Sequence, residues 1–225
     1  MWREIFRQAW EAMRRHRLRS TLSMLGVVWG IMAVTLLIAY GDGFHYAIMR
    51  GFDAFGPNAV IAWPLQTSMQ AGGQRAGKRV RFELEDVKWI EERCPLVEHV
   101  SPEAVRWLPL TYQGRLRNTA VRAVWPIYGE IRNEVPSEGR WLSQEDLLER
   151  RRVVFLGAWL RRKLFGGRPA VGETVQIAEV RFQVIGTMDT KMQMSNYFTS
   201  DDESAWIPLT TAGDAQRKNA DERNQ

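Results

Sequence analysis

The stretch Ser20–Gly41, STLSMLGVVWGIMAVTLLIAYG, contains no charged side chain. At about 1.5 Å of rise per residue, an α-helix of this length extends roughly 33 Å, enough to cross the hydrocarbon core of a bilayer. A helix also satisfies its backbone hydrogen bonds internally, as lipid requires. The sequence therefore predicts a transmembrane helix over residues 20–41, in preference to a buried core helix of a soluble protein.

The charges beside this stretch predict its orientation. Six arginines and two glutamates precede it, a net charge of +4, whereas the whole chain carries +5. A basic excess at one end of a membrane helix is typical of the cytoplasmic side. We therefore expect a single-pass protein of the plasma (inner) membrane, with a cytoplasmic N-terminus and a periplasmic or otherwise extracytoplasmic C-terminal region. Because the excess charge lies in one short segment, the high isoelectric point does not indicate a nucleic-acid partner.

A cleaved signal peptide is the alternative for the same stretch, with Ala39-Tyr40-Gly41 as a weak small-x-small cleavage site. Signal peptides have apolar cores of about 7–15 residues behind a short basic lead. Here the apolar run is longer and the lead is long, so the sequence favours an uncleaved anchor.

Residues 1–19 are predicted to form an amphipathic helix on the cytoplasmic surface of the membrane. Apolar residues recur at helical spacing and the basic residues lie largely on the other side. A basic helix with tryptophans on its apolar face suits the membrane interface, although a soluble packing helix is the alternative. The residues expected to anchor it are Trp2, Phe6, Trp10, Arg14, Arg15, Arg17 and Arg19.

Two further features follow along this helical region. Gly26 and Gly30 form a G-x-x-x-G pair, which predicts close contact with another membrane helix, although such pairs also arise by chance. Beyond the span, Phe44, Ile48 and Phe52 continue at helical spacing. We expect a stalk helix over residues 42–56 that couples the membrane span to the outer domain and ends at Gly56-Pro57-Asn58.

Residues 57–212 are predicted to form a mixed α/β extracytoplasmic domain, which makes the fold class α+β behind a single transmembrane helix. Loops at 66–78 and 126–140 could divide it into two lobes. Strands are expected at 59–63, in a hairpin that turns at Gln113-Gly114, and at 153–156, 174–178, 181–188 and 205–208; helices are expected at 83–93, from 143 to 148 and at 158–165. Residues 189–204 are predicted to be an exposed polar loop, and 213–225 a disordered tail.

The sequence offers little for catalysis. Its single cysteine, Cys94, is expected to be a small buried side chain of a packed helix, and its three histidines (His16, His45 and His99) have no metal-binding spacing. The acidic run Asp201–Glu203 is interpreted as solvated surface. There is no phosphate-binding G-x-x-x-x-G-K-[ST] motif. We therefore expect no enzyme activity, no cofactor and no metal site.

Seven blocks, in order, resemble the N-terminal part of FtsX-like/MacB-like ABC transporter permeases. They are RLRSTLSMLGVVWGIMAVTLLIAYGDG (17–43), FGPNAVIAWP (55–64), LEDVKWI (84–90), GRWLSQED (139–146), VVFLGAWLRRKLFGGRPAVGETVQI (153–177), FQVIGTM (182–188) and WIPLTTA (206–212). Their order and spacing over residues 1–212 match the first transmembrane helix and the periplasmic core domain of that family.

The resemblance implies a permease subunit of an ABC-type export or mechanotransmission system. Such permeases work as homodimers or permease heterodimers, driven by a cytoplasmic ABC ATPase, and some contact a periplasmic adaptor protein as well as membrane lipid. Members export macrolides, peptides or other amphiphiles, extract lipoproteins or activate cell-wall hydrolases. On this basis Gly26 and Gly30 would suit the dimer contact, and Phe44, Ile48 and Phe52 would transmit movement to the outer domain.

The sequence departs from the family in one respect. Family members carry three further membrane helices after the core domain, whereas no second apolar span follows here. We expect either an N-terminal fragment of a longer permease or a half-protein that another chain completes. A single-pass membrane-anchored binding module without transport activity is the alternative function.

Overall fold

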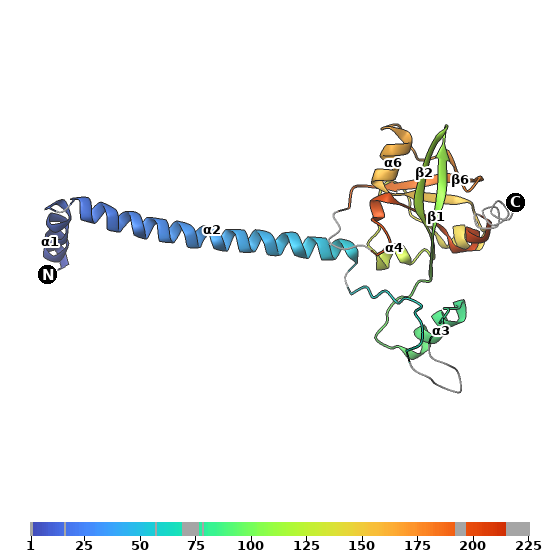
Figure 1. The fold of residues 1–225 in the computed structure, drawn as a ribbon, viewed down its shortest axis with the longest axis horizontal. Coiled ribbons are helices and arrows are strands. Elements are labelled where there is room, and N and C mark those ends of the chain that lie inside the picture. Colours follow the sequence, from blue (N-terminus) through green and yellow to red (C-terminus); the bar gives the residue numbers. More distant parts are fainter. Residues whose placement is uncertain are drawn as a thin grey trace. The chain divides into compact units, whose positions relative to one another are not determined.

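The computed structural model of the chain describes residues 2–15, 17–56, 58–68, 77, 79–191 and 197–214. The chain divides into two compact units, Met1–Met49 and Arg50–Gln225. Figure 1 shows the helices of the first unit and the mixed helices and strands of the second.

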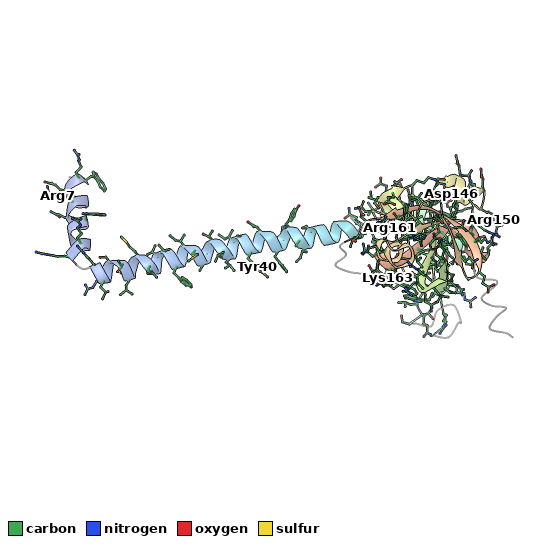
Figure 2. All side chains as sticks on the ribbon, turned by 90° about the horizontal axis from the view of Figure 1, so that it is seen from above. Arg7, Tyr40, Asp146, Arg150, Arg161 and Lys163 are labelled. Atoms are coloured by element: carbon green, nitrogen blue, oxygen red, sulfur yellow. The ribbon has the colours of Figure 1, made fainter. Side chains whose placement is uncertain are left out.

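The first unit consists of α1 (Trp2–Arg15) and most of α2 (Arg17–Phe55). The part of α2 from Arg17 to Met49 is long and apolar enough to cross a membrane, and its most apolar stretch has no buried residue. Side chains project all around α2, including the exposed Tyr40 (Figure 2). The hydroxyls of Thr21 and Thr35 donate to carbonyls one turn earlier, so even these polar groups are satisfied within the helix.

Because α2 is one continuous helix, the structure does not separate the predicted span (20–41) from the predicted stalk (42–56). That division, like the other domain boundaries, remains a prediction.

The second unit is built on a seven-stranded sheet, counted over the described residues (Figure 1). Its strands are β1 (Glu103–Tyr112), β2 (Arg115–Val124), β3 (Pro136–Gly139), β4 (Val153–Leu156), β5 (Thr174–Ile177), β6 (Val180–Met188) and β7 (Ser204–Pro208). Their order is β3-β6-β4-β7-β2-β1-β5, and β5 pairs with β6 as well as with β1. The sheet therefore closes into a barrel, with β3 added outside the ring on β6. Because β5 pairs with β6, neither of these two strands leaves an open sheet edge where the ring closes.

Alternating side chains of the strands form two cores, as the two-residue period of a strand requires. Val154 and Leu156 belong to the larger core inside the barrel, with Leu160 and Leu164 of α6 (Ala158–Phe165). Phe155 belongs to a second core on the outer face, which also includes residues near α4 (Tyr128–Ile131) and α5 (Gln144–Leu148). The strand predicted at 153–156 is confirmed as β4, and burial of all four of its residues shows that it is covered on both faces.

The predicted hairpin is confirmed. β1 and β2 pair in antiparallel register from Glu103–Val124 to Tyr112–Arg115. Gln113 (φ 47°) and Gly114 (φ 80°) both adopt positive φ, as a two-residue type I′ turn requires. The helix expected from residue 143 also forms as α5, and it begins at a capping box in which Ser143 and Asp146 bond reciprocally.

Other predictions in this unit are wrong. No strand forms at 59–63 among the described residues, where the only pairing is an isolated bridge between Gln66 and Arg79. The helix α3 (Leu84–Arg93) exists, but Val87 is its one buried residue, and Cys94 is exposed rather than packed. β3 was not predicted, because its sequence PSEG contains none of the residue types that favour strands. Most of the predicted loop at 66–78 and of the predicted tail at 213–225 lies outside the described residues.

Candidate functional site

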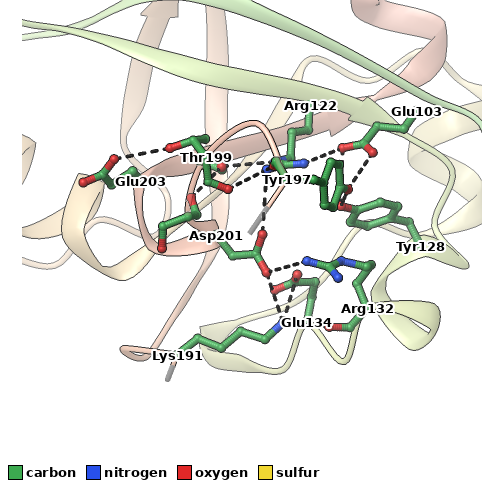
Figure 3. A network of polar contacts seen from close by, with 12 residues as sticks. Glu103, Arg122, Tyr128, Arg132, Glu134, Lys191, Tyr197, Thr199, Asp201 and Glu203 are labelled. Carbon is green, nitrogen blue, oxygen red and sulfur yellow. Dashed lines mark hydrogen bonds and ion pairs between the residues drawn. The ribbon is translucent and has the colours of Figure 1, made fainter. Parts of the chain in front are cut away.

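Residues 197–204, here called the strap, cross the outer face of the β1–β2 hairpin and lead into β7. Beneath the strap lies Arg122 of β2, which is fully buried. Its guanidinium donates to Glu103 Oε1 on β1 at 2.7 Å, to the carbonyl of Thr199 at 2.9 Å and to Ser204 Oγ at 3.1 Å (Figure 3). One side chain thus ties two strands to the strap.

Two tyrosines complete the upper part of this network. The Tyr197 hydroxyl donates to Glu103 Oε2 at 2.6 Å, and it lies 2.6 Å from the hydroxyl of Tyr128 on α4. The Arg122 guanidinium lies 4.7 Å from the centroid of the Tyr197 ring, a cation–π contact. Burial, together with the nearby Glu103 carboxylate, raises the pKa of both Tyr128 and Tyr197, so that both hydroxyls stay protonated and can donate.

The lower part joins the strap to the segment after α4. Lys191 Nζ donates to the Arg132 carbonyl at 2.7 Å, to Glu134 Oε1 at 3.1 Å and to Asp201 Oδ2 at 3.2 Å. Arg132 Nη2 also donates to Asp201 Oδ2 at 3.2 Å. Burial, and secondarily the charge of Asp201, raise the pKa of Glu134 to about 8, against the opposing effect of Lys191.

The network contains three basic side chains, Arg122, Arg132 and Lys191, and three acidic side chains, Glu103, Glu134 and Asp201 (Figure 3). Burying a charge is costly unless it is paired and hydrogen-bonded, and removing one partner leaves the others uncompensated. Separating the strap from these buried partners would therefore cost much free energy. This cost holds the strap in one position.

The strap also presents aromatic side chains. Phe198 adopts φ 71°, a conformation that is rare for a bulky residue. In this conformation its ring stacks on Trp107 of β1, with 5.8 Å between centroids, and both rings remain about half exposed. Trp63 packs edge-on against Tyr197 at 5.4 Å. The network therefore fixes an aromatic surface as well as a backbone path.

Chemically, the network is suited to holding structure. The described residues contain no group of three or more His, Cys, Asp or Glu side chains placed to bind a metal ion. The titratable groups of the network are engaged with one another and not arranged around a nucleophile. The arrangement can position a segment and couple several elements of the domain.

None of the residues predicted to anchor the surface helix, to contact another helix or to couple the stalk belongs to this network. Trp2, Trp10, Arg14 and Arg15 lie exposed on α1, and Arg17 and Arg19 lie exposed at the start of α2. The side chains of Phe6 and Phe52 lie outside the described part of the structure.

The remaining predicted residues lie on α2. Phe44 is exposed and Ile48 is partly buried. A Cβ atom added at Gly26 or Gly30 would meet nothing within 4 Å. Their predicted roles in helix contact and coupling stay predictions.

The expectation of an exposed polar loop at 189–204 is wrong for the strap, and the interpretation of Asp201 as solvated surface is also wrong. Asp201 and Ser204 are fully buried and Thr199 is nearly so, whereas Glu203 is exposed. The polar composition misled the prediction, because the strap's partners are charged residues far away in sequence. One available signal was Arg122, a lone charge inside the apolar run TAVRAV.

Comparison with known proteins identifies the family of this barrel. The profile of the MacB-like periplasmic core domain matches residues 20–224. The chain belongs to the MacB-like periplasmic core domain family. In this MacB-like chain the match covers most of α2 and the entire described barrel, strap included.

Two relatives show the extent of the similarity. The macrolide export ATP-binding/permease protein MacB of Bdellovibrio bacteriovorus is 31% identical over 211 residues, and that of Chlorobium luteolum is 29% identical over 205 residues. These alignments cover 93% and 91% of the MacB-like chain. The chain spans only about a third of these relatives, 32% and 31% of their lengths.

A solved structure shares the fold of the MacB-like chain. The crystal structure of the periplasmic region of MacB from Actinobacillus actinomycetemcomitans aligns with a TM-score of 0.52 at 16% identity, covering 65% of this chain and 64% of that one. The predicted fold class and the family resemblance are both confirmed.

Proposed function

We propose that this chain is the membrane-anchored extracytoplasmic part of an ABC-type export permease. The observation that carries the proposal is the family match over residues 20–224, which joins an apolar helix to a MacB-like core domain. The relatives that share this arrangement are named macrolide export ATP-binding/permease proteins. In this proposal the N-terminus is cytoplasmic and the barrel extracytoplasmic.

The proposed mechanism is transmission of movement driven by a cytoplasmic ABC ATPase. Support comes from α2, which is one uninterrupted helix from Arg17 to Phe55 and so joins the apolar region to the first residues of the second unit. An unbroken helix can carry a displacement along its axis, since its backbone hydrogen bonds make it stiff. Within the second unit, the ion network under the strap would pass the displacement between β1, β2, α4 and the strap.

A dimer is part of the same proposal, either with a second copy or with another permease chain. Gly26 and Gly30 lie on α2 with open space around them, as a helix contact in lipid requires. We also propose that α1 lies on the cytoplasmic membrane surface, because Arg14 and Arg15 at its end and Trp2 and Trp10 along it are exposed.

The single, exposed Cys94 allows a direct test of orientation by thiol labelling. In intact spheroplasts a membrane-impermeant maleimide should label Cys94, and a Cys94→Ser variant should give no signal. Labelling that requires permeabilised membranes would place the barrel inside the cell and overturn the proposal.

The same residue tests coupling. The full chain is isolated from its own membranes by affinity purification, and an ABC ATPase is sought among the co-purifying proteins by mass spectrometry. We expect ATP to change the rate of Cys94 labelling in that complex, whereas a non-hydrolysing ATPase variant should abolish the change. If the chain repeatedly purifies without an ATPase yet captures a ligand, the anchored binding module is the better description.

A further inference from the structure

A pocket of about 610 Å³ lies away from the ion network, between α3, α5 and the 3₁₀ turn Leu209–Thr211. Its volume falls in the range typical of sites for drug-sized molecules, roughly 300–1,000 Å³. Its apolar lining consists of Leu84, Trp125, Leu147, Leu148 and Leu209. Such a lining, with a few polar groups, is the usual composition of a small-molecule site.

Two of the leucine side chains that line the pocket are strongly exposed to water. Leu148 is 72% exposed and Leu84 is 57% exposed. Leu148 is the last residue of the short helix α5, and the residue before it, Leu147, is buried. A ligand with an apolar body would cover both leucines, and removing apolar surface from water is the main source of affinity for such sites.

One cation lines the pocket. Arg150 is the first of three consecutive arginines, which differ in their partners. Arg151 pairs with Glu149 at 2.7 Å and Arg152 pairs with Asp214 at 2.9 Å. Arg150 forms no ion pair with a carboxylate in the described part of the chain, and its Nη2 donates to the Thr210 carbonyl at 3.2 Å.

Arg150 has a left-handed backbone conformation (φ 54°) and follows Glu149, the C-cap residue of α5. The side chain lies at the outer edge of the domain, where Figure 2 labels it. A guanidinium carries five N–H donors in a planar fork that suits carboxylate, sulfonate or phosphate oxygens. The hydrogen bond from Arg150 to the Thr210 carbonyl uses one of these N–H donors, so the guanidinium can still bind an anion.

We propose that this pocket binds a small anionic amphiphile. Leu84, Trp125 and Leu148 would cover its apolar body, and Arg150 would bind its anionic group. The volume of about 610 Å³ lies within the range of sites for drug-sized molecules. This site goes beyond the proposed function, because binding requires neither an ATPase nor transport.

Two dyes with nearly the same apolar body provide the test. 8-Anilinonaphthalene-1-sulfonate carries an anionic sulfonate, and N-phenyl-1-naphthylamine lacks it. The full chain is placed in nanodiscs of zwitterionic lipid, and dye fluorescence is titrated with empty nanodiscs as the baseline. We expect saturable binding of both dyes above this baseline, with the anionic dye bound more tightly.

Variants then assign the site. Arg150→Gln should weaken the anionic dye about tenfold and leave the neutral dye unchanged, since one charge-assisted bond is lost. Leu148→Gln should weaken both dyes, and because Leu148 is 72% exposed the barrel should stay folded. Arg151→Gln is the matched control, since its side chain pairs with Glu149, and it should change neither affinity.

Three outcomes would overturn the proposal. Fluorescence equal to that of empty nanodiscs would place the dyes in the lipid. Equal effects of Arg150→Gln and Arg151→Gln would reduce the result to general surface charge. Unchanged affinities in Leu148→Gln would place the dyes elsewhere on the protein. None of these results bears on whether the chain couples to an ATPase.

Discussion

Arg122 Nη1 lies 2.7 Å from Glu103 Oε1, and this ion pair joins the C-terminal end of β2 to the first residue of β1 beneath the strap. The arginine side chain is fully buried, whereas the glutamate side chain keeps 16% of its surface exposed. A buried guanidinium is tolerated because the strap carbonyls and Ser204 complete its hydrogen bonds. The pair therefore depends on the strap, and the strap depends on the pair.

Replacing Arg122 by Met should destabilise the barrel by about 3–5 kcal/mol, because Glu103 and the strap carbonyls lose their buried cation. The measurement is chemical denaturation of the full chain in detergent, followed by near-ultraviolet circular dichroism. Trp206 is a suitable reporter, since it is fully buried and packs against Phe155 at 5.9 Å.

Arg117→Met is the control for this change. Arg117 lies exposed on the same strand, and its loss should alter stability by less than about 0.5 kcal/mol. Adding Glu103→Gln to Arg122→Met should cost less than the sum of the single changes. Strict additivity would show that the two residues do not act as a pair.

Glu134→Gln should make the stability of the barrel less dependent on pH. Burial and Asp201 raise the pKa of Glu134 from an ordinary value of 4.5 to about 8, so the folded state binds a proton that the unfolded state has lost. Between pH 4.5 and about pH 8, the free energy of unfolding of the parent therefore falls as the pH rises. Above about pH 8 the stabilisation by this proton is completely lost. Glutamine at this position carries no such titration.

We therefore expect the stability of Glu134→Gln relative to the parent to increase by more than about 1 kcal/mol when the pH is raised from 5 to 8. Unfolding curves at several pH values give the comparison. Glu138→Gln serves as the control, since the Glu138 side chain is half exposed where it pairs with Arg161. A pH-independent difference between Glu134→Gln and the parent would mean that Lys191 keeps Glu134 ionised throughout.

Gly139→Ala should be far more damaging than Gly167→Ala. Both glycines have positive φ, 75° and 88°, so alanine is strained at each by about 1–2 kcal/mol. At Gly139 the new Cβ would also lie 2.8 Å from Gly186 Cα and against the Ile185 carbonyl, whereas at Gly167 it would meet nothing within 4 Å.

The extra crowding should add at least about 2 kcal/mol at Gly139, because β3 and β6 must move apart. Thermal unfolding of the two variants side by side gives the comparison. Equal losses of stability would show that β3 shifts freely on β6.

Gly26→Leu and Gly30→Leu should weaken self-association of the chain in membranes about tenfold each, if these residues form the proposed helix contact. Energy transfer between labelled copies in vesicles measures the association. Gly41→Leu is the control on the same helix. At all three positions a Cβ has open space within the chain, so a change in signal reports contacts with another helix. Identical behaviour of the three variants would remove the pair from the dimer proposal.

Local chemistry made several elements predictable. The hairpin turn needs two residues that accept positive φ, and Gln113-Gly114 supplied the pattern. The capping box depends on Ser143 and Asp146, which are three residues apart. The apolar run at 153–156 has no polar side chain to expose, so its burial followed directly.

Elements with distant partners could not be predicted in this way. β3 pairs with β6 some 50 residues later in the chain, as the bond from Ser137 Oγ to the Thr187 carbonyl illustrates. The predicted strand at 59–63 failed for the converse reason, because strand propensity without a partner does not form a ladder.

The sequence by itself determined the long apolar helix, its basic flank and the local turns, because hydropathy, charge and backbone preference act over neighbouring residues. Only the tertiary structure decided that the sheet closes through β5 and β6, that Asp201 is buried and that Arg150 lines a pocket. A polar residue carries no mark of the partner that will neutralise it. Whether it faces water or a buried ion pair is set by segments that folding brings from elsewhere in the chain.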